Sequence, residues 1–182
     1  MSGAGQANGA NALGALAIGV SDLLLEAVQQ GSGLDLTETT ALLIVAERPG
    51  QSVADLASAL SLTHSGAVRV VDRLASSALL TREGGPDRRS IGLVVTVAGR
   101  EAVDAALDSR RQALQDLLEH LPPSRRASFL GGARTLAAAL PTDRRAAHRI
   151  CRMCEHDVCR GPACPVGSAV TTREAHTAKE SR

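Results

Sequence analysis

The chain has 182 residues, with 20 Lys and Arg against 19 Asp and Glu, and a formal net charge of +1. This length fits one domain of ordinary size with appendages, and the near-zero charge excludes a polycation, so any anion-binding surface must be local. Hydrophobic residues make up 44% of the sequence but aromatic residues only 1%, and Phe129 is the sole aromatic. The core must therefore be built from aliphatic side chains, a mixture typical of helical packing.

The N-terminal sequence MSGAGQANGA has no basic targeting region and little to bury, so we expect residues 1–11 to be disordered. Nothing approaches about 18 unbroken apolar residues, and we therefore expect no membrane span and a location in the cytoplasm. Over residues 12–30 the apolar positions recur at three- and four-residue steps. This periodicity predicts an amphipathic helix that ends at the sequence GSG.

The next segments predict three more helices in quick succession. Thr37 caps the first of them, which stops at Pro49 and Gly50. Ser52 begins the second, and Asp55 three residues later comes close to a capping box. After the short turn SLT, the stretch HSGAVRVVDRLASSALL carries one apolar stripe. Two helices joined by so short a turn predict a helix-turn-helix.

The pattern then changes from a helical to a strand period. Two β-prone arms, Leu79–Arg82 and Ile91–Val97, flank a Gly-Gly-Pro-Asp turn and predict a hairpin with a basic tip. A long helix is expected over 98–120, and after two prolines Ser124 caps another that runs to Leu140. The predicted fold is mainly α with a small β-hairpin wing, and residues 168–182 read as a disordered tail.

The segment LSLTHSGAVRVVDRLASSALLTREGGPDRRSIGLVVTVAGRE, residues 60–101, resembles the MarR family of winged helix-turn-helix transcription regulators. It is similar to that family's recognition helix, its wing with the D-R-R element, and the T-x-x-G start of the next helix. The likeness spans roughly residues 13–140, and the wing is shorter than in many relatives. The resemblance implies this organisation: a domain over 12–141, with a DNA-binding lobe at about 37–97 and dimerisation helices at about 12–30 and 98–140.

Helix-turn-helix proteins place the N-terminal half of the second helix in the major groove, and a wing arginine can enter the minor groove or hold the backbone. Arg69 suits a guanine edge, and hydroxyls at the helix start suit bases or phosphates. Asp87 would orient a neighbouring arginine, as the family's paired Asp and Arg do. The predicted DNA-binding residues are Thr63, His64, Ser65, Gly66, Arg69, Arg73, Arg82, Asp87, Arg88 and Arg89.

An ordinary solvated face would contain similar residues, since positive charges exceed negative ones by only two within 63–90. The helix-turn-helix punctuation and the wing favour double-stranded DNA as the partner. The outer helices have apolar faces longer than one small core needs, which predicts a homodimer. The resemblance further implies a repressor rather than an activator, and an unidentified small-molecule effector. No catalytic constellation is evident, and an adaptor that has lost DNA binding is a weaker alternative.

All four cysteines lie in the stretch CRMCEHDVCRGPACPVG, residues 151–167, with the spacing C-x2-C-x4-C-x4-C. This spacing suits one tetrahedral site, and the leading hypothesis is a structural zinc ion. An iron–sulfur cluster or a labile zinc that acts as a sensor and controls DNA binding is the second hypothesis. Unligated thiols are the third, and His156 could replace one sulfur. The predicted ligands are Cys151, Cys154, Cys159 and Cys164.

Residues 142–167 contain few apolar side chains and are predicted to form a cysteine-rich metal-binding appendage. Such a segment buries too little apolar surface to fold alone, and a structural zinc site supplies roughly 10 kcal/mol or more of folding free energy. We therefore expect the metal to order this appendage.

Overall fold

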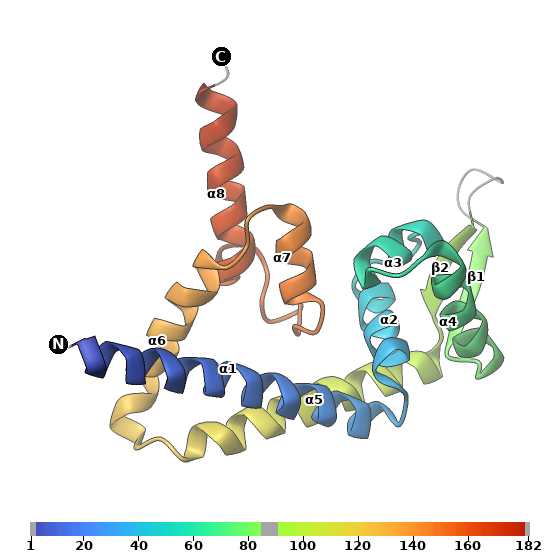
Figure 1. The fold of residues 1–182 in the computed structure, drawn as a ribbon. Helices are drawn as coiled ribbons and strands as arrows, with labels where there is room; N and C mark the ends of the chain where they lie inside the picture. The colour runs from blue at the N-terminus through green and yellow to red at the C-terminus, as the bar shows by residue number, and fades with distance from the viewer. Residues whose placement is uncertain (1–2, 85–90, 181–182) are drawn as a thin grey trace.

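The fold is known from a computed structural model that describes residues 3–84 and 91–180. Long helices form a base, and a compact lobe with a hairpin stands at one end of it (Figure 1). In chain order the elements are α1 (Gly3–Ser32), α2 (Leu36–Glu47), α3 (Val53–Leu60), α4 (His64–Ser76), β1 (Leu80–Gly84), β2 (Ile91–Val95), α5 (Val97–Glu119), α6 (Pro123–Ala139), α7 (Arg144–Cys151), the 3-10 helix η1 (Gly161–Ala163) and α8 (Pro165–Glu180). The mainly α fold class with a β-hairpin wing is confirmed.

Side-chain caps fix where most of these helices begin. Asp35 caps α2, Thr63 caps α4 and Asp143 caps α7, each accepting a hydrogen bond from a backbone N–H within the first helical turn. At α3 the predicted capping box is present: the Ser52 hydroxyl accepts from the Asp55 N–H, and the Asp55 carboxylate accepts from the Ser52 N–H. Helix α2 therefore begins two residues earlier than predicted, because its N-cap is Asp35 and not Thr37.

The apolar core of the compact lobe forms around α2. Residues 39–45 of this helix are all buried, so α2 is surrounded on every side. The core contains only aliphatic side chains, as the composition required. Its buried members are Ala41, Leu42, Leu43, Ile44, Val45, Leu56, Val70, Val71, Leu74, Leu80, Leu93 and Val103. Since they come from α2 through α5, the helix-turn-helix, the wing and the start of α5 share one core.

The wing is an antiparallel pair of strands with a third chain segment beside it. Leu80 of β1 pairs with Val95 of β2, and Gly84 pairs with Ile91. Gln51 forms an additional antiparallel bridge to Leu93, closed by N–H···O bonds of 2.8 and 2.9 Å. This bridge attaches the wing to the turn after α2, and no local sequence pattern predicts it.

A tight backbone contact sets the angle between the wing and α5. The Thr96 hydroxyl accepts from the Gly99 N–H at 3.0 Å and donates to the carbonyl of Ala78 at 2.7 Å. A Cβ at Gly99 would lie 2.0 Å from the carbonyl oxygen of Leu79, closer than any real contact. Glycine is therefore required here for close approach, which explains the T-x-x-G pattern physically.

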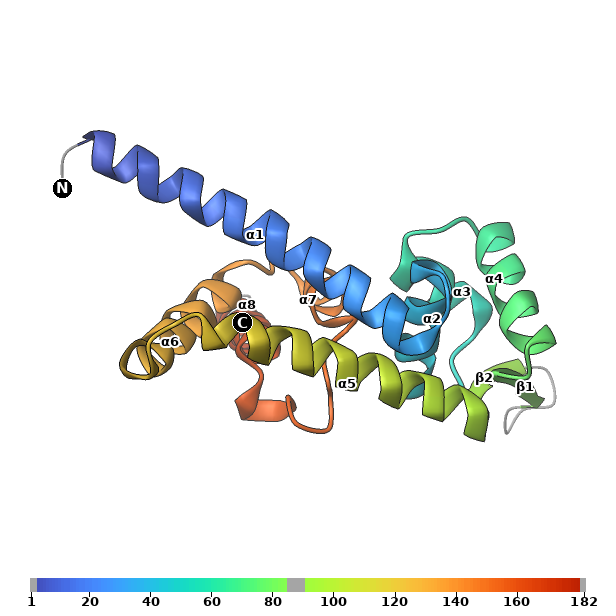
Figure 2. The same cartoon turned by 90° about the horizontal axis from the view of Figure 1, so that it is seen from below.

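Helices α1 and α5 lie side by side near the C-terminal end of α1 and diverge toward its N-terminus (Figures 1 and 2). They come closest at Gly31, where a Cβ would meet the Ala105 carbonyl oxygen at 2.5 Å. Ala27 and Val28 of α1 are buried, whereas the N-terminal half of the helix is exposed. Among the described residues, one helical segment, Gly5–Ser32, is long and apolar enough to cross a membrane by length and composition, which by itself is weak evidence for a span.

Both terminal segments differ from the expectation of disorder. Residues 3–11 continue α1 without a break, although five of them are Gly or Asn, and no proline interrupts the helix. Residues 168–180 belong to α8, whose Val166 and Val170 pack with Ala147 of α7 in a second, small apolar cluster. The apolar residues of 168–180 show too little periodicity to predict a helix, because only the first turns of α8 pack against a neighbour.

Replacement of Gly99 by alanine tests the contact between the wing and α5. The added Cβ must displace the Leu79 carbonyl, so Gly99→Ala should lower the free energy of unfolding by about 2 kcal/mol or more. Denaturant unfolding followed by far-ultraviolet circular dichroism measures this. Gly131 of α6 has open space around its Cβ position, and Gly131→Ala should instead stabilise by about 0.5–1 kcal/mol. Equal effects of the two substitutions would contradict the assignment.

Candidate nucleic-acid interface and cysteine cluster

The N-terminal half of α4 presents small polar side chains to solvent. Thr63, His64 and Ser65 are exposed, and Gly66 is half-buried. The Thr63 hydroxyl accepts from the Gly66 N–H at 3.1 Å, so it acts first as a helix cap. A Cβ at Gly66 would press on that hydroxyl at 3.2 Å. The residues predicted to approach base edges therefore share one exposed surface, and its start is rigidly capped.

The three described arginines of this region differ in what they contact. Arg73 donates to Glu38 at 2.5 Å and pairs with Asp35 at 3.3 Å, which ties α4 to the start of α2. The hydrogen bond that Arg73 donates to Glu38 raises the pKa of Arg73 above its usual range. Arg69 is exposed and forms no ion pair with any residue that the structure describes.

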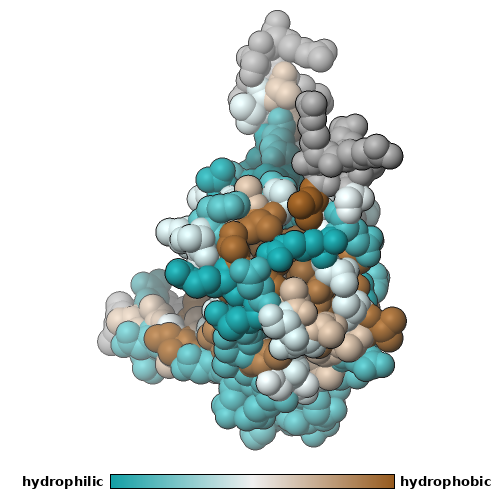
Figure 3. Space-filling model, turned by 90° about the vertical axis from the view of Figure 1, so that its right-hand side faces the viewer, coloured by the Kyte–Doolittle hydropathy of each residue, from teal (hydrophilic) through white to brown (hydrophobic). Residues whose placement is uncertain are grey.

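Arg82 of the wing is similarly engaged, through a 2.7 Å ion pair with Asp72 of α4. Its exposed side chain lies on β1, and that strand's polar side faces solvent. Seen from the side of α4 and the wing, the surface is a mixture of hydrophilic, neutral and apolar patches (Figure 3). The other predicted wing residues, Asp87, Arg88 and Arg89, lie outside the described ranges.

The four cysteines lie on one short segment that joins α7 to α8. Cys151 ends α7, Cys154 follows in a turn closed by its N–H to the Cys151 carbonyl at 2.9 Å, and Cys159 closes a second turn. Cys164 precedes α8, and its Sγ accepts from the Gly167 N–H at 3.2 Å. All four side chains are half-buried and unbridged by disulfides.

The thiols interact with one another. The interaction between Cys151 and Cys154 is the strongest. A hydrogen bond from Cys151, together with the nearby Arg110 and His156, lowers the pKa of Cys154 to about 6. The same pairing raises the pKa of Cys151, with a smaller contribution from Cys164. Burial and Cys164 raise the pKa of Cys159 to about 11. Cys154 therefore ionises more readily than Cys151 or Cys159.

A partly buried arginine lies near this cluster. The Nε atom of Arg110 on α5 is buried and has no hydrogen-bond partner among the described residues. Its positive charge favours the thiolate form of Cys154. By contrast, no set of three or more His, Cys, Asp or Glu side chains in residues 3–84 and 91–180 is arranged to hold a metal ion.

His156 is oriented away from a ligand role. Its Nε2 lies 3.1 Å from the Cys151 carbonyl oxygen, and its Nδ1 lies 3.4 Å from Glu47. Both ring nitrogens thus already face oxygen acceptors. The histidine joins the cysteine segment to the end of α2.

Further contacts attach the cysteine segment to the compact lobe. Arg160 pairs with Glu47 at 3.4 Å, and Arg111 of α5 pairs with Glu155 at 3.3 Å. Met153 packs against the main apolar core. The segment therefore packs against α2 and α5 of the same protomer instead of hanging free.

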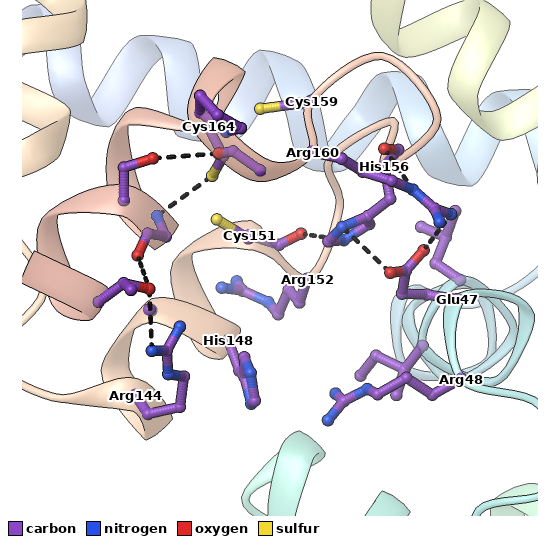
Figure 4. Close-up of a pocket in the computed structure, with 18 of the residues that line it drawn as sticks. Glu47, Arg48, Arg144, His148, Cys151, Arg152, His156, Cys159, Arg160 and Cys164 are labelled. Carbon is purple, nitrogen blue, oxygen red and sulfur yellow. Dashed lines mark hydrogen bonds and ion pairs between the residues drawn. The ribbon is translucent and has the colours of Figure 1, made fainter. Parts of the chain in front are cut away.

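A cavity of about 750 Å³ opens between the end of α2 and the cysteine segment. Figure 4 shows Cys151, Cys159 and Cys164 on one side of it, with basic side chains around them. This cavity was not predicted from the sequence. One pattern that points to it is the spacing of basic residues on α7, which places His148 and Arg152 one and two turns after Arg144 on the same helical face.

Residues 32–90 match the MarR family model. Among solved structures, the YusO protein of Bacillus subtilis is 21% identical, with a TM-score of 0.64, and the match covers 76% of this chain and 99% of that one. RV1404 of Mycobacterium tuberculosis is 23% identical, with a TM-score of 0.63 and coverage of 71% and 90%. The MarR family protein RV2887 of Mycobacterium tuberculosis, in complex with p-aminosalicylic acid, is 27% identical, with a TM-score of 0.52 and coverage of 68% and 97%. No curated protein matches the sequence.

The environment of His148 predicts a pH dependence of stability. Burial, followed by Arg48 and Arg144, lowers the pKa of His148 below its ordinary value of 6.5. As the pH falls through that value, the unfolded chain binds a proton that the folded chain resists, so the free energy of unfolding decreases. His148→Gln should reduce the decrease measured by chemical denaturation between about pH 7.5 and about pH 5.5. Identical pH profiles for parent and variant would contradict this.

Proposed function

We propose that this chain, a winged helix-turn-helix protein of the MarR type, is a cytoplasmic transcription regulator that binds double-stranded DNA as a homodimer. The observation that carries the proposal is the family match over 32–90, which coincides with an exposed, polar and well-capped start of α4. In such proteins the start of the second helix meets base edges in the major groove. A regulator of this kind needs no catalytic group, and we assign none.

Within this proposal, the arginines have different roles. Arg69 has no carboxylate partner among the described residues, and its guanidinium is available for a guanine edge or a phosphate. Arg73 and Arg82 are held by carboxylates and keep α4 in place against α2 and β1. Arg88 and Arg89 remain proposed wing contacts, oriented by Asp87. Repression follows if the operator overlaps a promoter.

The exposed apolar side chains of the outer helices support a dimer. They cluster on the N-terminal half of α1 and on α6, a helix with no buried residue in the protomer. Burying such surface drives association, and two-fold symmetry would present two copies of α4 to successive turns of DNA. The exposed residues are Leu13, Leu16, Ile18, Phe129, Leu130 and Leu136.

We also propose that Cys151, Cys154, Cys159 and Cys164 hold a structural zinc ion. Their spacing, their mutual interactions and the ready ionisation of Cys154 support this, since zinc binds thiolates. The described side chains are not arranged to hold a metal ion, so zinc binding requires the four cysteines to rearrange. The alternative of an iron–sulfur sensor gains nothing from the comparisons.

Substitution of Arg69 is the sharpest test of DNA recognition. A duplex is first selected from a random-sequence pool with the parent protein, and affinity is then measured by fluorescence anisotropy. Arg69→Ala should weaken binding by roughly tenfold to a hundredfold without lowering stability, and the parent's affinity should fall steeply with salt. Arg125→Ala on α6 is the matched control and should leave affinity unchanged. Failure to select any duplex would sink the proposal and favour the adaptor alternative.

Metal analysis tests the cysteine assignment. Protein purified without oxygen should contain one zinc ion per chain and be colourless, and chelation should lower its thermal stability. Cys154→Ser should lose the zinc, whereas Met153→Leu, a neighbouring substitution that leaves all four thiols, should retain it. A brown protein that contains iron and sulfide would show that the cysteines hold an iron–sulfur cluster and not zinc. Protein that is purified without metal, and whose thermal stability does not change with zinc or chelator, would show that the cysteines are free thiols.

A further inference from the structure

Apolar side chains line part of the cavity beside the cysteine segment. Leu43 and Ile44 of α2 form one wall, and Ala147 of α7 and Pro162 of η1 contribute to the other. Its volume of about 750 Å³ lies within the usual range of roughly 300–1,000 Å³ for small-molecule sites. The cavity could therefore enclose much of a small organic molecule.

Positive charge is concentrated at the rim of the cavity. Four arginines line it, and two of them are already paired: Arg144 with Glu174, and Arg160 with Glu47 and Asp157. Arg48 and Arg152 form no ion pair within the part of the chain that the structure describes. Arg48 is the C-cap residue of α2, and Arg152 follows α7, so the two unpaired charges come from opposite walls.

The same positive charge affects the pKa of a neighbouring histidine. His148 lines the cavity, and Arg48 and Arg144 add to burial in lowering its pKa. The charge on these guanidinium groups is therefore felt inside the cavity and is not fully offset by carboxylates. An anion placed there would relieve the repulsion among the cations.

We propose that this cavity binds a small amphipathic anion, with its carboxylate or phosphate group between Arg48 and Arg152 and its apolar part against Leu43 and Ile44. Guanidinium groups bind both anion types by paired, charge-assisted hydrogen bonds. The cavity is built largely from residues beyond 140, so it belongs to the C-terminal segment and not to α4 or the wing.

Occupation of the cavity would join the end of α2 to the cysteine segment. If the proposed function holds, the ligand would then influence how the DNA-binding lobe is held. The binding step itself does not depend on DNA. Its test is performed without DNA, so failure of the regulator proposal and failure of this one give different results.

The test uses two matched dyes and the full metal-loaded chain. The amphipathic anion 8-anilinonaphthalene-1-sulfonate is titrated against the protein, and N-phenyl-1-naphthylamine, which lacks the sulfonate, is the neutral comparison. The sequence contains no Trp or Tyr, so protein fluorescence does not interfere. The anionic dye should bind at one site per chain and more tightly than the neutral one.

Charge removal should weaken the anionic dye alone. Arg48→Gln and Arg152→Gln should each reduce its affinity by about tenfold, while leaving the neutral dye unchanged. Arg125→Gln, an exposed arginine on α6, is the control and should have no effect. If one variant fails to fold by circular dichroism, the other still decides. Parent-like affinity in a folded Arg48 or Arg152 variant would overturn the proposal.

Competition then identifies the anionic group. Displacement of the dye by benzoate assigns a carboxylate, and displacement by inorganic phosphate assigns a phosphate. Displacement by neither would overturn the proposal. Displacement by a random-sequence DNA duplex would also overturn it, since these arginines would then belong to a nucleic-acid surface.

Discussion

The complete burial of α2 is the constraint on which the rest of the structure depends. A helix that is apolar on every side must be covered on every side, and α3, α4, β2 and the start of α5 provide most of that cover. Ion pairs then fix both ends of α2. Arg73 of α4 holds its start through Asp35 and Glu38, and the cysteine segment holds its end through Glu47.

This arrangement gives the C-terminal segment a physical role. Its described ion pairs reach α5 and the end of α2, the helix around which the compact lobe is built. A change at the cysteines, or an anion between Arg48 and Arg152, would act first on the end of α2. Because the helices of the lobe share a single core, we expect such a change to alter the orientation of the lobe and not its internal packing.

Much of the lobe could be predicted from sequence because its signals are local. The Ser52 capping box, the turn before α4 and the strand period of the wing each lie within a few residues of the element they specify. The bridge from Gln51 to Leu93 and the packing of α8 depend on residues far apart in the chain, which periodicity does not record. The cavity was missed for the same reason, since Arg48 and Arg152 come together only in the fold.

The central claim, that the start of α4 meets DNA, is tested most directly by hydrogen–deuterium exchange of the full chain with and without a selected duplex. DNA should slow exchange over residues 63–69 and leave exchange over residues 123–139 of α6 unchanged. Slower exchange elsewhere, with no change over 63–69, would contradict the account and place the binding surface on another part of the molecule.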